Sequence, residues 1–118
     1  MEIRLRLDGD DGRELLSLYR WLRQDPDVTR NGRVSLVPTA SRPGEMGGAY
    51  EAVSAQIGHV IALAGLIIAY RGWSDTRRKD RRPVARIERD GVAVELEGAS
   101  ADDVRRVAQA LGMPDEPR

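Results

Sequence analysis

The spacing of apolar side chains changes along the chain, and each spacing predicts a different element. The opening stretch EIRLRLD alternates apolar and polar residues over positions 2–8, which is typical of a half-buried strand. From Leu15 to Leu22 the apolar residues instead recur at helical spacing. This helix is expected to end before Asp25-Pro26, because a proline disfavours the helical region for the residue that precedes it.

The middle of the chain predicts a second strand and then one long helix. Asn31-Gly32 indicates a turn, and RVSLV after it predicts a strand that ends at Pro38. Residues 38–48 hold two prolines and three glycines, so they predict a loop between two halves of the fold. A long apolar helix is then expected over residues 49–73.

The last third of the chain predicts a connector, a hairpin and a closing helix. Residues 74–83 are charged and break the helical pattern, so we expect a solvated connector there. Asp90-Gly91 stands between two short stretches of apolar and polar residues, which is the strongest short-range signal of a β-hairpin. Ser100 followed by Asp103 predicts a capping box for a final helix, and residues 114–118 are expected to form a frayed tail.

Together these elements predict one α+β domain over residues 1–118, in the order β-α-β, loop, long α, β-hairpin, α. Four short strands and three helices favour a four-stranded sheet that packs on the central apolar helix. A chain of 118 residues is close to the usual size of one domain and can bury a core without metals or disulfides.

The central helix raises the question of a membrane, because residues 60–70 contain no strongly polar side chain. A bilayer span takes about 20 mostly apolar residues, and extending the run toward the N-terminus admits Gln56, Ser54 and Glu51. In the other direction, Trp73 and the basic residues after it imitate the flank of a membrane helix. A membrane-associated or pore-forming protein that inserts residues 52–70 is therefore the alternative to a cytoplasmic domain.

Small residues follow one line of this predicted helix, at Gly58, Ala62, Gly65 and Ala69. Such a stripe lets another backbone approach closely. The helix is also apolar nearly all round, and one sheet with two short helices can hardly cover every face of it. We therefore expect these four residues and Trp73 to form an interaction surface for another copy or a partner chain. The alternative, in which the protein's own strands and first helix cover this face, stays open.

The composition argues against most catalytic chemistry. The chain has no cysteine, which removes disulfides, thiol nucleophiles and thiolate metal sites and fits a cytoplasmic protein. Nineteen basic residues balance nineteen acidic ones, so no global field favours nucleic acid. The single histidine, His59, has no acidic residue three or four positions away, which favours a structural role over a base or a ligand. We expect no enzymatic activity, no catalytic residues, no cofactor and no metal.

Several motifs occur in the order found in a known family. The helix LLSLYRWLRQDPDV is followed by RVSLVPTASRPGEMGG, a strand and a proline-bearing loop with a Gly-x-Met-Gly signature at Gly44, Met46 and Gly47. The apolar helix ends in the aromatic and arginine segment YRGW, and VARIERDGVAVELEGAS supplies a closing hairpin. Over nearly its whole length, the chain resembles the effector-associated constant component family, first type, of actinobacterial NTP-dependent conflict systems.

The resemblance implies a non-enzymatic adaptor. Members of the family look like partners encoded beside variable effectors, such as caspase-like or trypsin-like peptidases, and beside NTPase sensors. The resemblance implies that the protein couples sensor to effector in bacterial defence and that it has no catalytic or cofactor residues. The expected partners are an effector protein, a sensor NTPase or both, together with further copies of the chain in a homo-oligomer.

Overall fold

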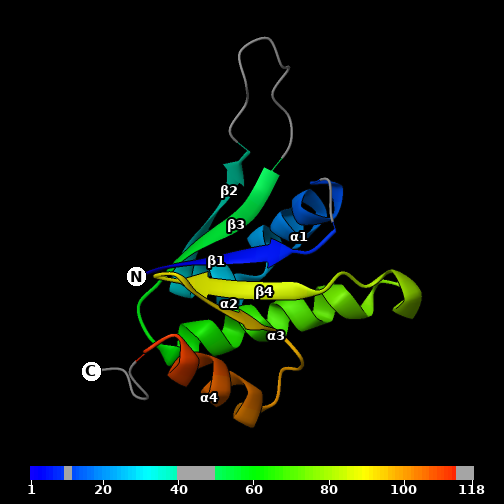
Figure 1. The fold of residues 1–118 in the computed structure, drawn as a ribbon. Coiled ribbons are helices and arrows are strands. Elements are labelled where there is room, and N and C mark those ends of the chain that lie inside the picture. Colours follow the sequence, from blue (N-terminus) through cyan, green and yellow to red (C-terminus); the bar gives the residue numbers. More distant parts are fainter. Residues whose placement is uncertain (10–11, 40–49, 114–118) are drawn as a thin grey trace.

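A five-stranded antiparallel sheet forms one layer of the protein (Figure 1). The computed structural model describes residues 1–9, 12–39 and 50–113. The strands are β1 (Glu2–Leu7), β2 (Gly32–Pro38), β3 (Tyr50–Ile57), β4 (Ala85–Arg89) and β5 (Val92–Glu95), in the spatial order β2-β3-β1-β4-β5. The helices are α1 (Arg13–Gln24), α2 (Pro26–Asn31), α3 (Val60–Asp75) and α4 (Ala101–Ala110), with a short 3-10 helix, η1 (Lys79–Arg81). The α+β class is confirmed, but the prediction of a four-stranded sheet is wrong.

The first strand of the chain is the centre of the sheet. β1 pairs antiparallel with β3 on one side and with β4 on the other. Leu5 stands opposite both Val53 and Ile87, and all three side chains are buried. The alternation in EIRLRLD is thereby confirmed, because its apolar face lies in the core while its polar face lies on the other side of the sheet.

The prediction of one helix over residues 49–73 is wrong in its first third. Residues 50–57 form β3, which pairs with β1 on one side and with β2 on the other. Residues 52–55 are all buried, so the centre of β3 is covered on both of its faces. Val53, Ala55 and Ile57 belong to the core and alternate with Ser54 and Gln56, so residues 53–57 do have the period of a strand. This alternation is short and is followed closely by the apolar residues of α3, so the sequence pattern predicts one continuous helix instead.

His59 separates this strand from the helix that follows. It is the N-cap of α3, and its Nδ1 accepts a hydrogen bond from the N–H of Ala62 at 3.2 Å. The histidine therefore has a structural role, as expected, although it lies before the helix rather than within it.

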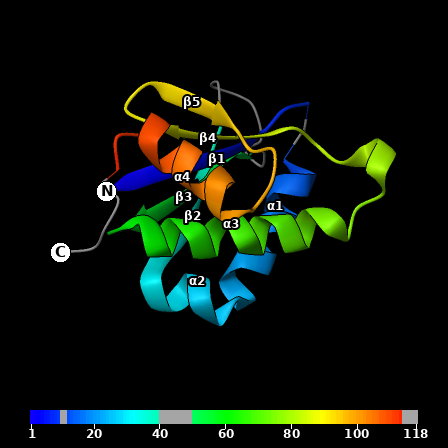
Figure 2. The same ribbon diagram turned by 90° about the horizontal axis from the view of Figure 1, so that it is seen from below.

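The helices lie on one side of the sheet, and α3 is flanked within that layer (Figure 2). α1 and α2 pack along one flank of α3, and α4 packs along the other. Leu63, Leu66 and Ile67 are each at most 1% exposed. α3 is apolar around most of its circumference, and most of that apolar surface is buried, as is expected for a helix of this composition.

A short helix that the sequence pattern did not predict, α2, follows α1 at once. α1 ends before Asp25-Pro26 as expected. The Asp25 carboxylate then accepts hydrogen bonds from the N–H groups of Asp27 and Val28, at 2.9 and 3.2 Å, and starts α2. The prediction of a turn at Asn31-Gly32 is wrong, because this pair joins α2 directly to β2.

The local signals in the last third of the chain are confirmed. Asp90 and Gly91 have φ angles of 51° and 83° and join β4 to β5, as a tight hairpin requires. Ser100 and Asp103 form the capping box of α4. The connector expected at residues 74–83 includes the last residues of α3 and all of η1.

Gly32, at the start of β2, is expected to tolerate no side chain. A Cβ at this position would lie 2.7 Å from the carbonyl oxygen of Gln56, so the pairing of β2 with β3 would have to shift. We expect Gly32→Ala to lower the free energy of unfolding, measured in urea, by about 1–3 kcal/mol.

Gly65→Ala is the matched control for this variant. Nothing lies within 4 Å of a Cβ at Gly65, and alanine is favoured over glycine inside a helix by up to about 1 kcal/mol. Equal losses of stability in the two variants would contradict the steric explanation.

Candidate interaction surface

The small residues expected to form an interface do not make one continuous exposed line. Ala62 and Ala69 are 4% and 5% exposed and belong to the hydrophobic core. Gly58 is exposed but precedes α3, because the segment before Val60 is not helical. Gly65 is half-buried, with open space at its Cβ position.

Trp73 lies in the core, where it fixes the end of α3 against α1. Its side chain is 1% exposed, and its indole N–H donates to Ser17 Oγ at 3.1 Å. The guanidinium of Arg77 lies 4.7 Å from the centre of the Trp73 ring and also donates to Ser17 Oγ, and its Nε lies 2.8 Å from the Glu14 carboxylate. Trp73 and Arg77 therefore hold the C-terminal end of α3 against α1.

The apolar surface that remains uncovered on α3 is the pair Ile61 and Ile68. Their side chains are 57% and 58% exposed, which makes them the most exposed large hydrophobic residues in the part of the chain that the structure describes. They are seven positions apart, about two helical turns, so they share one face of α3. The small residues Ala64 and Gly65 lie between them on this face.

Two charged residues that follow Ile68 indicate from the sequence which face of α3 is exposed. Arg71 and Asp75 follow Ile68 at spacings of three and seven, and both are exposed. They form an ion pair, with Arg71 Nε 3.3 Å from Asp75 Oδ1. Charged side chains are rarely buried, so these two residues mark the line of α3 that points away from the core, and Ile61 and Ile68 lie on that line.

α4 turns this exposed face into one wall of a groove. The groove is lined by Val60, Ile61, Ala64, Ile68, Ala99, Ala101, Val104 and Arg105. Arg105 is the one charged residue in this set, and its Nη1 lies 3.4 Å from the Asp102 carboxylate. The groove is therefore apolar along its length and its rim carries internally paired charges.

Contacts from the sheet hold α4 in place beside α3. Arg89 of β4 donates a hydrogen bond to the carbonyl oxygen of Leu111 at 2.7 Å, at the C-terminal end of α4, where the last carbonyls of a helix lack partners. Arg106 donates to the carbonyl oxygen of Glu95 in β5 at 3.3 Å. At the N-terminal end, hydrogen bonds from Ser100 lower the pKa of the Asp103 carboxyl below its ordinary value.

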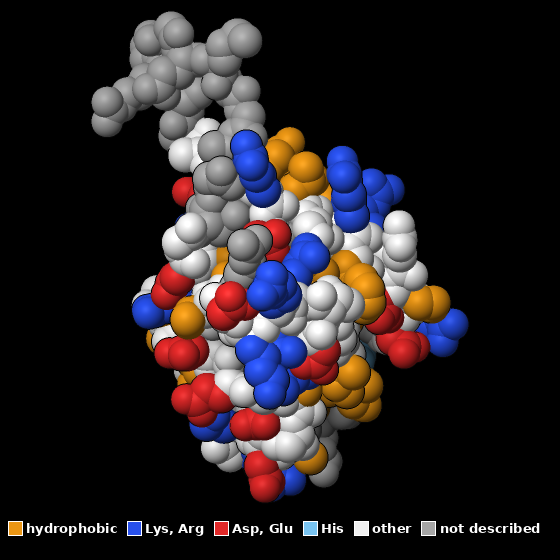
Figure 3. Space-filling model, turned by 90° about the vertical axis from the view of Figure 1, so that its right-hand side faces the viewer, with side chains coloured by type: hydrophobic (Ala, Val, Ile, Leu, Met, Phe, Trp, Pro, Cys, Tyr) orange, Lys and Arg blue, Asp and Glu red, His pale blue; other side chains and the backbone are white. Residues whose placement is uncertain are grey.

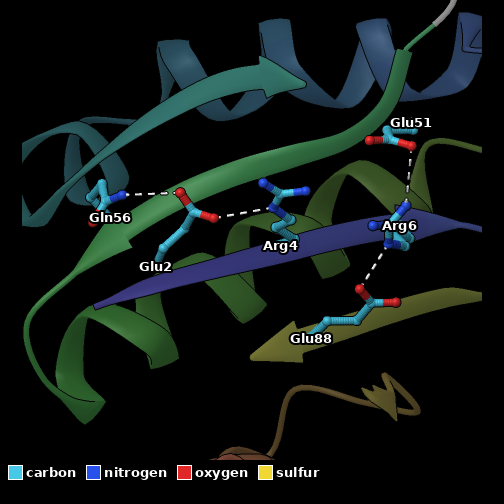
Figure 4. Close-up of polar contacts among 6 residues, drawn as sticks. All are labelled: Glu2, Arg4, Arg6, Glu51, Gln56 and Glu88. Atoms are coloured by element: carbon cyan, nitrogen blue, oxygen red, sulfur yellow. Dashed lines mark hydrogen bonds and ion pairs between the residues drawn. The ribbon is translucent and has the colours of Figure 1, made fainter. Parts of the chain in front are cut away.

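The opposite face of the sheet carries paired charges (Figure 4). Arg4 Nε lies 3.1 Å from the Glu2 carboxylate, and Arg6 lies between Glu51, at 3.8 Å, and Glu88, at 2.8 Å. In Figure 3 as well, acidic and basic side chains are interspersed on the side of the molecule that is shown. Such pairs neutralise one another, so they form neither a field of one sign nor a cluster of unpaired carboxylates.

The structure also bears on the expectation that the protein has no metal site. Among the described residues, no three His, Cys, Asp or Glu side chains lie close enough together to hold a metal ion. Burial raises the pKa of the Tyr70 hydroxyl above its ordinary value of 10.0. The loop signature Gly44, Met46 and Gly47 lies outside the described residues.

The proposed membrane segment is not one helix. Residues 52–57 belong to β3, and α3 has 16 residues. Within residues 1–9, 12–39 and 50–113, no helix combines the length and the apolar character that crossing a bilayer requires. The expectation of a single inserting helix over residues 52–70 is therefore wrong.

A family model matches the sequence over residues 7–112, which reach from the end of β1 to just beyond α4. The family is described as Effector Associated Constant Component 1. The chain belongs to this family. No curated protein and no solved structure matches the chain. As an Effector Associated Constant Component 1 protein it has an effector-associated role, and the family resemblance of its motifs is confirmed.

The capping box of α4 makes a prediction about acid. Because Asp103 has a lowered pKa in the folded protein, its contribution to stability is present above the unfolded value and is lost as the pH falls through the folded value. We expect Ser100→Ala to raise the pKa of Asp103 toward its ordinary value of 3.8, measured by NMR titration of the carboxyl group. An unchanged titration midpoint in Ser100→Ala would show that other groups set this pKa.

Proposed function

We propose that this Effector Associated Constant Component 1 protein is a non-enzymatic adaptor that couples a sensor NTPase to an effector, such as a caspase-like or trypsin-like peptidase, in bacterial defence. The observation that carries the proposal is the exposed pair Ile61 and Ile68 beside an apolar groove. Apolar surface of this kind marks contact sites between proteins. The family description supports it, because it associates the chain with an effector.

An amphipathic helix of the effector is the occupant that we propose for the groove. Two helices form the walls, and the small residues Ala64 and Ala101 line it, so a third helix can approach closely. Recognition of a helix in a groove depends on apolar side chains spaced along one helical face. The ion pairs of Arg71 with Asp75 and of Arg105 with Asp102 leave the rim without a strong preference for either sign of charge.

A homo-oligomer through the same face is the competing arrangement, because a second copy can also cover Ile61 and Ile68. In that case, the copies and the effector would compete for one surface. The two occupants differ in a measurable property, since self-association depends on the concentration of this chain alone.

The test replaces both exposed isoleucines in the double variant Ile61→Glu/Ile68→Glu. Because these side chains are more than half exposed, we expect the free energy of unfolding to change by less than about 1 kcal/mol. We expect the affinity for the effector encoded beside the gene to fall at least about tenfold, measured by calorimetry. Gly65→Leu, which places a large side chain between the two isoleucines, is expected to weaken the complex as well.

Val84→Glu is the matched control, since Val84 is 43% exposed and does not line the groove. It should leave the affinity unchanged. Light scattering of the wild-type protein alone distinguishes the occupants: an oligomer that the double variant dissolves favours a second copy. Full affinity of the double variant for the effector would contradict the proposed surface.

A further inference from the structure

The outer edge of β2 is a second surface that can bind a partner, through its main-chain hydrogen-bonding groups. Among the described residues, β2 is the last strand at one side of the sheet and its one partner strand is β3. On its outer side, its main-chain N–H and C=O groups therefore face no neighbouring strand. β2 has 7 residues, whereas β5 at the opposite edge has 4. Long open edges attract additional strands and short ones resist them, so β2 is the edge that is suited to accept one.

Arginine side chains without an acidic partner gather in the segments that lead to this edge. Arg20, Arg23, Arg30 and Arg33 are all exposed, and within the described part of the chain none of them forms an ion pair. In contrast, ion pairs are formed by Arg4, Arg6, Arg71, Arg77, Arg78, Arg82, Arg86, Arg89, Arg105 and Arg106, among others. The charge balance of the whole chain thus conceals a local excess of positive charge.

The acidic residues near these arginines do not cancel them. Asp25 and Asp27 are the acidic residues of the stretch from Arg20 to Arg33. The Asp25 carboxylate is engaged in the N-cap of α2. Two carboxylates against four guanidinium groups leave the stretch from Arg20 to Arg33 basic, and a basic segment attracts acidic partners.

A groove runs beside the edge and brings two of the arginines together. It is lined by Tyr19, Arg23, Thr29, Gly32, Arg33 and Val34. The guanidinium of Arg23 lies 5.6 Å from the centre of the Tyr19 ring, and its Nη1 donates to the Tyr19 hydroxyl at 3.3 Å. These contacts hold one positive charge beside the open edge.

The two faces of β2 define the side chains that an added strand should have. Val34 and Leu36 are half-buried, stand opposite the core residues Ala55 and Val53, and pack against the core. The alternate residues, Arg33 and Ser35, are exposed on the other face. Cross-strand neighbours on one face interact directly, so a complementary strand has apolar residues on one face and acidic residues on the other.

We propose that the edge of β2 binds an extended acidic segment of a partner protein as an additional strand of the sheet. The apolar residues of the segment cover Val34 and Leu36, the carboxylates on its other face pair with Arg33, and Arg23 of α1 adds positive charge in the groove beside the edge. The main-chain groups of β2 supply the hydrogen bonds, as in other cases of strand addition. This proposal concerns a different surface from the groove between α3 and α4 and does not depend on the occupant of that groove.

Nucleic acid is the other polyanion that a basic groove can attract, but the groove is poorly suited to it. Binding of single strands depends on aromatic side chains on which bases stack. Tyr19 is the one aromatic residue that lines this groove, and Arg23 already lies over its ring. The main-chain groups of the strand edge, in contrast, can form hydrogen bonds with an extended peptide.

The test uses a fluorescein-labelled peptide in which Glu and Val alternate over about eight residues, the length of an ordinary strand. We expect it to bind in fluorescence anisotropy at low salt and to protect the amides of β2 from hydrogen exchange. Arg23→Glu/Arg33→Glu should weaken binding at least about tenfold, because two attractions become repulsions. Arg78→Glu/Arg86→Glu carries the same change of net charge on other exposed sites and should have little effect.

Two further probes separate the contributions of charge and strand pairing. A peptide with the same number of Glu residues but with Pro in place of Val cannot pair along β2 and should bind at least about tenfold more weakly. A single-stranded oligonucleotide should bind no better than this control. Arg23→Gln/Arg33→Gln, which avoids new repulsion, should weaken binding of the Glu-Val peptide to a smaller extent.

Three results would overturn the proposal. They are the absence of binding of the Glu-Val peptide at low salt, equal binding of the proline peptide, and tighter binding of the oligonucleotide with loss in the Arg23→Glu/Arg33→Glu variant. Ile61→Glu/Ile68→Glu should bind the Glu-Val peptide like the wild type. Failure at the β2 edge is therefore distinguishable from failure of the adaptor surface on α3.

Discussion

The burial of α3 under the sheet is the constraint on which the rest of the structure depends. α3 is apolar around most of its circumference, and water-exposed apolar area of that size is unfavourable. Leu63, Leu66 and Ile67 are buried in the core that α3 shares with the sheet, and α1, α2 and α4 pack along the flanks of α3. One line along the surface of α3 is not covered by the other elements, and Ile61 and Ile68 lie on this line. The candidate interaction surface is thus what remains when a chain of this size has covered as much of α3 as it can.

The elements that could be predicted from the sequence are those with a local cause. The alternation of β1, the Asp90-Gly91 hairpin and the Ser100 capping box each depend on residues within a few positions of one another. β3 is different, because it is a strand on account of its hydrogen bonds to β1 and β2, which come from distant parts of the chain. Its sequence, YEAVSAQI, alternates between apolar and polar residues only over positions 53–57, and several of its residues favour helices in isolation.

The candidate surface could be predicted only in part, for a related reason. The composition of residues 60–70 predicts that α3 has more apolar surface than the fold can cover easily, but which residues stay exposed depends on the rotation of α3 about its axis. That rotation is set by contacts with other elements. Examples are the hydrogen bond from the Trp21 indole N–H to the carbonyl oxygen of Ala69, at 2.9 Å, and the hydrogen bond from the Trp73 indole N–H to Ser17 Oγ. The small residues Ala62 and Ala69 therefore lie inside, while the isoleucines face outward.

The two candidate surfaces differ in place and in chemistry, and this has a consequence for an adaptor. β2 is at one edge of the sheet, whereas α4 packs under β5 at the other edge. Neighbouring strands lie about 4.8 Å apart, so the two edges of a five-stranded sheet are separated by roughly 20 Å. One surface is apolar with paired charges at its rim, and the other is an open strand edge beside unpaired arginines. Under the two proposals, a partner that fits one surface would have little affinity for the other, so two different proteins could bind at once without competing. Simultaneous binding of this kind is what the proposed adaptor role requires, because a link between a sensor and an effector needs two separate contact surfaces.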